Sequence, residues 1–194
     1  MLMDGMFLRN PTIFLVDTLF SLYVLALMLR FLFQWVEADF YNPISQTLVR
    51  ITHPLLRPLR RVLPAIGRID TASIVLMLTI QVLGGWLIFL IQGVDFSIGF
   101  LMTWAISQIV ELFFNIYLFA IIAVAVLSWI SPLPRNAASS LLTSLTYPVL
   151  NACRRLLPSM GGLDLSPILA FIAIQFCKML VMPPLQQLAS AFNY

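Results

Sequence analysis

One block of polar residues occurs twice in the chain with identical spacing. It reads Arg-Arg-x-x-Pro-x-x-Gly-x-x-Asp and begins at Arg60 and again at Arg154. An arginine close to an anionic leaflet contributes about 1 kcal/mol to membrane binding. Proline and glycine ahead of an aspartate favour a turn that leads into a helix N-terminus. The lipid- or partner-binding candidates are Arg50, Arg57, Arg60, Arg61, Arg154 and Arg155, and the turn and cap candidates are Pro64, Gly67, Asp70, Pro158, Gly161 and Asp164.

Several charged or polar side chains fall inside apolar stretches, where ionisable groups are costly and usually functional. Asp17 and Glu111 occupy matching positions of the two halves, and they are interpreted either as solvated acids near the outer interface or as a paired acidic mouth for cations. Lys178 needs a polar or acidic partner, or must extend to an interface. Arg30 is expected to reach the cytoplasmic interface. The intramembrane candidates are Asp17, Arg30, Gln81, Glu111, Asn115, Gln175 and Lys178.

The sequence carries no recognisable catalytic or metal-binding pattern. His53 is the single histidine, and Cys153 and Cys177 are not part of a Cys-x-x-Cys motif, which favours packing over redox chemistry. There is no nucleophile with a neighbouring base, no phosphate-binding glycine loop and no zinc signature. The chain is therefore predicted not to be an enzyme and to need no cofactor or metal.

The composition excludes a soluble globular domain. Of the 194 residues, 61% are hydrophobic and 10% are charged, whereas a soluble domain has about 45–50% and about 25%. So few charges cannot cover a water-exposed surface. The net charge of +3 would suggest nucleic acid in a soluble protein, but in a membrane protein the positions of the charges matter more. We therefore expect an integral membrane protein that does not bind nucleic acid.

Four stretches are apolar enough to cross a bilayer core of about 30 Å, which takes about 20 helical residues. They lie at about 12–36, 72–92, 98–130 and 167–188. The third is longer than one crossing requires, so either it tilts, or its first part lies at the interface with Trp104 as an anchor. Because main-chain groups in lipid must bond internally, the predicted fold class is an all-α membrane protein with four transmembrane helices.

The arginines indicate which side of the membrane each connection occupies. Segment 37–70 carries five arginines and segment 131–166 carries three, whereas the opposite side has Arg9 alone. Cytoplasmic connections are enriched in Lys and Arg. Both segments are therefore placed in the cytoplasm, and both termini are predicted to be periplasmic.

The two halves of the chain are repeats of one another. A shift of 94 positions superposes them without a gap, and it matches Trp35 with Trp129 as well as the two polar blocks. Two spans per unit give both units the same orientation in the membrane. The predicted repeats are 1–94 and 95–194.

An amphipathic segment is expected at the cytoplasmic interface in each repeat, at about 42–64 and 136–158. In the first, apolar residues recur at steps of three and four while three arginines gather on another side. Pro54 and Pro58 should divide the segment into two short helices with a bend at 52–54. The alternative is an ordinary loop whose arginines only set the orientation of the spans.

These segments resemble the YggT family of small bacterial membrane proteins, which is also present in plastids. The signature appears at 39–46 as Asp-Phe-Tyr-Asn-Pro-Ile-Ser-Gln and at 54–64 as Pro-Leu-Leu-Arg-Pro-Leu-Arg-Arg-Val-Leu-Pro, and it returns at 147–164. The second copy departs from the pattern at Asn151 and Ala152, where Arg and Pro are usual. The resemblance implies an inner-membrane location, roles in osmotic-stress tolerance, cell division or nucleoid organisation, cytochrome b6 maturation for plastid relatives, and no catalytic residue.

Two functions from different classes fit these patterns. The first is a membrane scaffold or assembly factor that binds anionic phospholipid and membrane or cytoplasmic proteins. The second is a small ion or solute channel or transporter active in the osmotic response, which with four spans would need a homo-oligomer. The repeated block favours the first, because it is predicted to be interfacial while the polar residues inside the spans are sparse.

Overall fold

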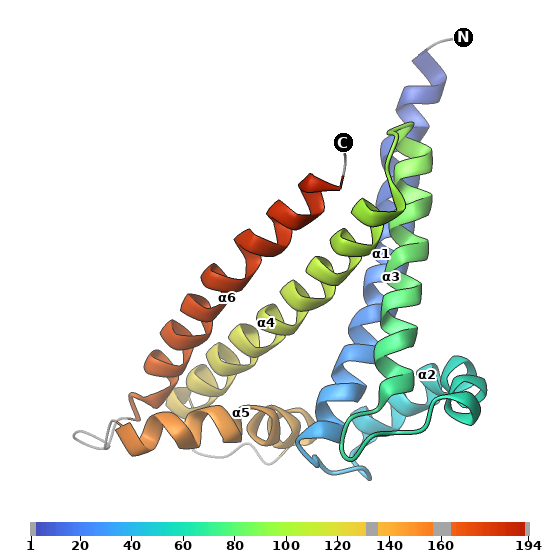
Figure 1. Ribbon diagram of the computed structural model, residues 1–194. Helices are drawn as coiled ribbons and strands as arrows, with labels where there is room; N and C mark the ends of the chain where they lie inside the picture. Colours follow the sequence, from blue (N-terminus) through green and yellow to red (C-terminus); the bar gives the residue numbers. More distant parts are fainter. Residues whose placement is uncertain (1–2, 131–135, 157–163, 193–194) are drawn as a thin grey trace.

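Six helices make up the computed structural model in the residues that it describes, which are 3–130, 136–156 and 164–192. The long helices are α1 (Met3–Trp35), α3 (Thr71–Gln92), α4 (Ile98–Ile130) and α6 (Ser166–Ala191). The other two, α2 (Pro43–Val62) and α5 (Ala137–Leu156), lie across one end of the long helices (Figure 1). The chain termini lie at the opposite end. An even number of crossings within each repeat produces this arrangement.

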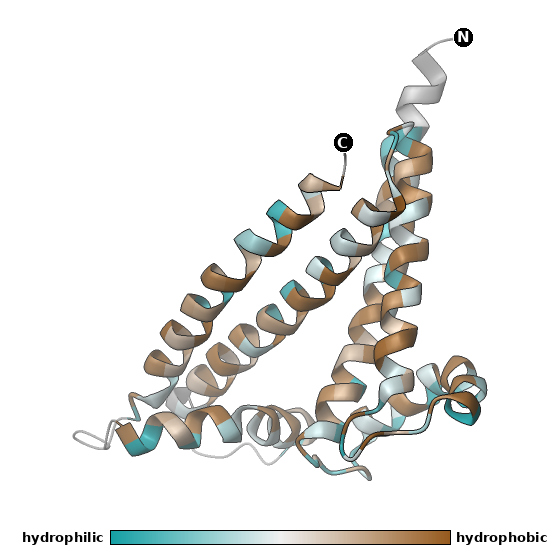
Figure 2. Cartoon of the chain, in the orientation of Figure 1, coloured by the Kyte–Doolittle hydropathy of each residue, from teal (hydrophilic) through white to brown (hydrophobic). Residues whose placement is uncertain are grey.

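The four long helices are the predicted membrane spans, so the prediction of an all-α membrane protein with four spans is confirmed. The segments Arg9–Trp35, Thr71–Gln92, Ile98–Ser128 and Ser166–Ala191 are long and apolar enough to cross a membrane, and apolar residues predominate along them in Figure 2. Helix α4 is continuous over 33 residues, so its first part is not a separate interfacial helix. It is inclined to α1 and α3 in Figure 1.

Each repeat packs its two spans against each other, α1 on α3 and α4 on α6, while α3 and α4 make contact between the repeats. Two adjacent glycines permit close approach on two sides of α3. A Cβ at Gly84 would lie 2.8 Å from the ring of Phe20 on α1, and a Cβ at Gly85 would overlap the ring of Trp104 on α4. Trp104 therefore packs between the repeats, rather than anchoring an interfacial helix.

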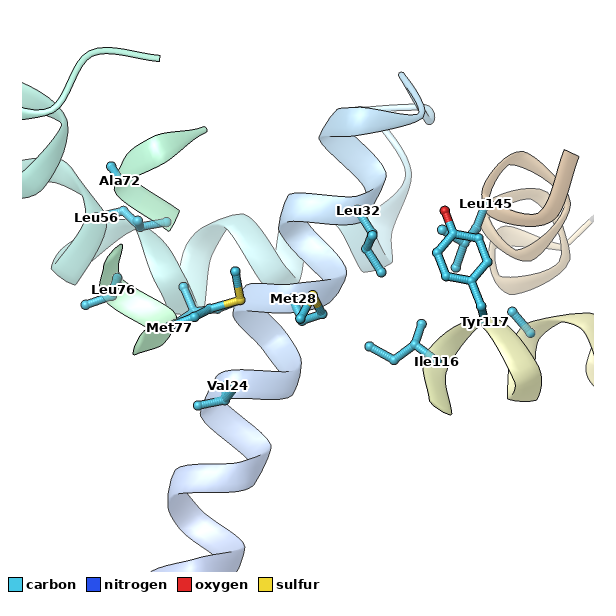
Figure 3. Packing of buried hydrophobic residues seen from close by; sticks show 12 residues of the cluster. Val24, Met28, Leu32, Leu56, Ala72, Leu76, Met77, Ile116, Tyr117 and Leu145 are labelled. Atoms are coloured by element: carbon cyan, nitrogen blue, oxygen red, sulfur yellow. The ribbon is translucent and has the colours of Figure 1, made fainter. Parts of the chain in front are cut away.

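The largest apolar cluster joins both repeats near the ends of the spans that carry α2 and α5. Figure 3 shows Met77 of α3 beside one side of α1, and Leu32 on the other side of α1, facing Tyr117 of α4 and Leu145 of α5. Leu27, Leu32 and Leu145 are almost completely buried. Because α2 and α5 bury residues in this cluster, they are fixed parts of the fold.

The prediction that proline divides the first amphipathic segment into two helices is wrong. Helix α2 continues from Pro43 to Val62 with Pro54 and Pro58 inside it. A proline within a helix leaves the carbonyl four residues earlier without its amide donor. Both prolines and Arg50 lie on the exposed side of α2, where water can bond to such carbonyls. The cost of the prolines is therefore smaller here than inside a span.

Candidate functional site

Helix α2 has three different strips along its length. Its buried strip, which packs on α1 and α3, consists of Ser45, Leu48, Thr52 and Leu56. At about 100° per residue, Arg50, Arg57 and Arg61 fall on the side away from this strip. We call these three residues the arginine stripe. An exposed apolar strip lies between the two and consists of Ile44, Ile51, Leu55 and Val62. This order places apolar side chains where α2 can enter a lipid interface and guanidinium groups beside it.

The arginine stripe is not used to hold the fold together. Its three side chains are exposed, and among the described residues none of them has a hydrogen bond or an ion pair with protein. Arginine carries five N–H donors and remains charged at every physiological pH. The stripe therefore presents free donors at the end of the molecule where α2 and α5 lie.

Arg60 differs from its neighbour Arg61, although the sequence groups them as a pair. Its side chain reaches Asp70 at the start of α3 and forms an ion pair and hydrogen bond with the carboxylate. The Asp70 side chain is only 2% exposed and also accepts a hydrogen bond of 2.6 Å from the Ser73 hydroxyl. Arg60 and Asp70 therefore connect the end of α2 to the start of α3.

The environment of Asp70 favours its charged form. Burial raises the pKa of this carboxyl, but the hydrogen bonds from Arg60 and Ser73, together with the positive charge of Arg60, outweigh burial. The net effect is a pKa below the ordinary value of aspartic acid. Asp70 is thus ionised whenever the fold is intact near neutral pH, and it holds Arg60 in place.

The second repeat has the same ion pair. Arg154 of α5 lies 2.7 Å from the carboxylate of Asp164, which also accepts a hydrogen bond from the amide of Ser166. Burial raises the pKa of Asp164, but the hydrogen bonds from Ser166 and Arg154 and the positive charge of Arg154 outweigh burial, so its pKa is again below the ordinary value. Arg155, the counterpart of Arg61, is exposed and has no protein partner among the described residues.

The turn predicted between the arginine pair and the aspartate is present in the first repeat. Gly67 has a φ of 60°, in the left-handed region that favours glycine, and the main chains of Ile66 and Ile69 bond to each other across it. Asp70 stands at the N-cap position of α3 as predicted, but its carboxylate makes no capping hydrogen bond. In the second repeat the cap position belongs to Leu165, one residue after Asp164. Pro158 and Gly161 lie outside the described residues.

Arg30 is buried where α1 meets α2. It is 8% exposed, and its Nη1 donates hydrogen bonds to the hydroxyl of Thr52 at 2.6 Å and to the carbonyl of Val49 at 3.4 Å. Thr52 in turn donates to the Leu48 carbonyl at 2.7 Å. Arg30 has no carboxylate within ion-pair distance among the described residues. This contact could not be predicted from the sequence, because Arg30 and Thr52 belong to different helices.

A second polar cluster lies between α4 and α6. Lys178 Nζ is 3.0 Å from Glu111 Oε1 and 2.7 Å from Asn115 Oδ1. Asp17, the counterpart of Glu111, is exposed and accepts a hydrogen bond from Ser21 at 3.4 Å. The two acids therefore have separate partners, and the structure gives no direct contact between them. The half-buried Gln81 and Gln175 make no side-chain hydrogen bond among the described residues.

Asn42 joins the two repeats where α2 and α5 begin. Its Oδ1 accepts the amide of Ile44 at 2.9 Å and so caps α2, while its Nδ2 donates to the carbonyl of Ala137 at 2.7 Å. Its counterpart Asn136 accepts the amide of Ser139 at 2.7 Å. The sequence shift of 94 positions matches the two asparagines, but it did not predict that one would bond to the other repeat.

The described residues contain no group of His, Cys, Asp and Glu side chains that could hold a metal ion. Burial raises the pKa of the Cys153 thiol, which keeps it protonated and unreactive. Cys177 is exposed on α6. Nothing in the described geometry points to a catalytic residue.

Comparison with known proteins agrees with the repeat. The family model described as CCB3/YggT matches the chain twice, at residues 10–92 and 103–185. The chain belongs to the CCB3/YggT family. The two matched segments contain most of one α1–α2–α3 unit and most of one α4–α5–α6 unit. One match of the family model therefore corresponds to one repeat of this chain.

Relatives of this CCB3/YggT chain occur in bacteria and in a plant. An uncharacterised Pseudomonas aeruginosa protein is 45% identical over 90% of this chain and 89% of its own length. The Escherichia coli K12 protein YggT, also uncharacterised, is 36% identical over 91% of this chain and 92% of its own length. The chloroplastic YlmG homolog protein 2 of Arabidopsis thaliana is 44% identical over 32% of this chain and 24% of its own length. No solved structure gives a significant match.

Proposed function

We propose that this membrane protein is a non-enzymatic scaffold or assembly factor of the bacterial inner membrane, with α2 and α5 on the cytoplasmic side. The observation that carries the proposal is the arginine stripe of α2, which is exposed, free of protein partners and next to an exposed apolar strip. Its guanidinium groups bind anionic phospholipid while the apolar strip enters the interface. Both termini are then periplasmic, and the exposed ends of α2 and α5 present a surface to partner proteins.

The two repeats contribute unequally to lipid binding. Helix α2 has the three residues of the arginine stripe, whereas α5 has Arg155 as its one exposed arginine without a protein partner among the described residues. Asn151 stands where α2 has Arg57. Since each arginine near an anionic leaflet contributes about 1 kcal/mol, the first repeat supplies most of the electrostatic binding. Such an anchored platform suits a role in envelope or division organisation, or in osmotic-stress tolerance.

The polar residues inside the spans support the scaffold over a channel. Lys178, Glu111 and Asn115 bond to one another, and Asp17 bonds within α1. Side chains that satisfy each other in this way do not form a continuous polar path along the described spans.

Lipid retention by the purified protein tests the proposal. Native mass spectrometry should show that the wild type retains phosphatidylglycerol more strongly than phosphatidylcholine, and that replacing Arg50, Arg57 and Arg61 with Gln removes most of this preference. The preference should also shrink as salt rises, because these charges are close to water. Arg68→Gln is the matched control, because Arg68 is exposed on the same side but already lies 2.9 Å from Glu37.

Equal retention of both lipids by the wild type would contradict the proposal. Crosslinking in cells should identify protein partners at α2 and α5. A flux assay with the purified protein in liposomes addresses the channel alternative, and ion or solute flux there would overturn the scaffold.

A further inference from the structure

A pocket of about 420 Å³ lies where the end of α1 meets α2. Its polar wall consists of Arg30, Gln34, Glu37, Ser45 and Arg60. Phe33 and Leu48 contribute to an apolar wall beside it. Arg30 is five residues before the end of α1, or about 7.5 Å at 1.5 Å per residue. The pocket is therefore at the depth where the headgroups of a surrounding bilayer begin.

Arg30 offers unused hydrogen-bond donors to this pocket. Its two hydrogen bonds to protein both come from Nη1, so Nε and Nη2 have no acceptor among the described residues. Neither nitrogen is among the buried side-chain atoms that lack a partner, and Arg30 lines the pocket. The free donors of Arg30 are therefore accessible and can bind an acceptor inside the pocket.

Ser45 is a second unpartnered polar group on the wall. The residue is 7% exposed, and its Oγ is buried without a hydrogen-bond partner among the described residues. Ser45 belongs to the buried strip of α2, on which an alanine would pack equally well. Because Ser45 lines the pocket, rotation about its Cα–Cβ bond would give this hydroxyl a partner in a ligand there.

The charges around the pocket leave one positive charge uncompensated. Arg60 is paired with Asp70, and Glu37 is paired with Arg68. Arg30 has no acidic partner within ion-pair distance among the described residues. A ligand with a single negative charge would therefore neutralise the pocket, and the planar fork of arginine matches the oxygens of a phosphate group.

We propose that the pocket between α1 and α2 binds one phosphate group, in a form with a single negative charge, through Arg30, Arg60 and Ser45. A lipid headgroup phosphate and a free phosphate anion share this chemistry. The site uses Arg30 and Ser45, which are not in the arginine stripe, so it is separate from the proposed surface binding of lipid. An experiment can therefore contradict one of the two proposals and leave the other intact.

The second repeat lacks this site. The positions that match Arg30 and Gln34 are occupied by Val124 and Ser128. Thr146, the counterpart of Thr52, is buried and bonds only to main-chain carbonyls of its own helix among the described residues. The chain should therefore bind one phosphate group in a pocket of this kind, not two.

Calorimetric titration of the full chain in a nonionic detergent tests the proposal. The probes are dihexanoyl phosphatidylglycerol, inorganic phosphate, and dihexanoylglycerol, which lacks the phosphate. The wild type should bind phosphatidylglycerol saturably with one site and should not bind dihexanoylglycerol. Binding of inorganic phosphate as well would assign the site to free phosphate groups in general, whereas binding of the lipid alone would assign it to a headgroup.

Two variants separate a binding role from a structural one. Arg30→Gln should lower the affinity at least about tenfold, in line with the loss of a charged hydrogen bond. Ser45→Ala should weaken binding about threefold to tenfold while the melting temperature stays the same or rises, because it removes an unpartnered buried hydroxyl. Arg61→Gln is the matched control, which should leave the single-site affinity unchanged although it weakens surface retention of lipid.

The proposal is overturned if the wild type binds neither phosphate probe, or if Arg30→Gln and Ser45→Ala both bind like the wild type. Loss of the surface preference in the Arg61→Gln protein with the single site intact supports both proposals. If the surface preference is absent from the wild type but the single site is present, the arginine stripe proposal fails and the pocket remains.

Discussion

Adjacent arginines in each repeat have different tasks. Arg60 and Arg154 are held by Asp70 and Asp164, each ten positions later, while Arg61 and Arg155 remain exposed. A helix turns about 100° per residue, so two neighbours cannot point to the same place. Because of this rotation, only the first arginine of each pair points toward the aspartate ten positions later, and the second points away from it.

The sequence predicted part of this arrangement. The spacing of Gly67 and Asp70 behind the arginine pair indicated a turn before a helix, and Gly67 forms it. The ion pairs were not predicted, because the aspartates were interpreted as helix caps. The signal was available: opposite charges recur ten positions apart in both repeats. The contact of Arg30 with Thr52 has no such repeated pattern in the sequence, because it depends on how α2 lies across α1.

The two ion pairs should differ in their contribution to stability. Asp70 is buried, whereas the Asp164 side chain is 37% exposed. Replacing Asp70 with Asn leaves the Arg60 charge without its partner and should lower the unfolding free energy by about 1.5–3 kcal/mol. Asp164→Asn should cost less than about 1 kcal/mol, as for exposed ion pairs. Thermal unfolding of both variants in the same detergent provides the comparison, and equal losses would contradict it.

Acidification should destabilise the fold through Asp70. Its pKa is lower in the folded state than in the unfolded chain, where an aspartic acid has a pKa of about 3.9. The stabilisation is therefore complete above that value and is lost as the pH falls through the lower folded pKa. Melting temperatures measured from pH 7 down to about pH 3 should fall more steeply for the wild type than for Asp70→Asn. Parallel curves would show that this carboxyl does not carry the effect.

At the level of elements, the sequence predicted the spans well and the interfacial helix less well. Long apolar stretches allow little else than a helix in lipid, so α1, α3, α4 and α6 were found. Proline was taken to interrupt α2, but α2 continues, because burial of its Leu48 and Leu56 strip against two spans outweighs the lost hydrogen bonds. Proline effects at a water-exposed surface depend on tertiary packing, which local sequence does not contain.

The close contacts of α3 can be tested with small substitutions. Gly85→Ala places a methyl group against the Trp104 ring and should separate the repeats slightly. Overpacking costs about 1–3 kcal/mol, which exceeds the gain of about 1 kcal/mol from replacing glycine in a helix. The melting temperature should therefore fall. Leu83→Ala, at an exposed position next to the two glycines, is the control and should have a much smaller effect.

For the whole molecule, the repeat determines the shape of the protein. Two units of two spans each bring α2 and α5 to one end and both termini to the other (Figure 1). The contact between the units runs through α3 and α4, and through α5 against α1 and α2. The repeat was evident from the shift of 94 positions, whereas the way in which the units meet was not. The hydrogen bond from Asn42 to Ala137 of the other repeat is an example. Nothing in the sequence of one repeat indicates which residues of the other repeat it contacts.

The proposed orientation in the membrane can be tested at the C-terminal end of the chain. With the arginines of α2 and α5 in the cytoplasm, a reporter fused after residue 194 should be active only if it functions in the periplasm. A periplasmic phosphatase and a fluorescent protein that folds in the cytoplasm form a matched pair of fusions. Fluorescence from the second fusion, with an inactive phosphatase in the first, would reverse the orientation.

The central claim is that Arg61 and Arg155, the second arginine of each pair, contribute to surface binding of anionic lipid, whereas Arg60 and Arg154 stabilise the fold through their ion pairs with Asp70 and Asp164. The most direct test measures melting temperature and phosphatidylglycerol retention on two double variants, Arg61→Gln with Arg155→Gln, and Arg60→Gln with Arg154→Gln. We predict that the first double variant retains phosphatidylglycerol less strongly, by about 2 kcal/mol for two arginines, at an unchanged melting temperature, and that the second has a lower melting temperature. A first double variant that retains phosphatidylglycerol like the wild type, or a second that melts like the wild type, would contradict the claim.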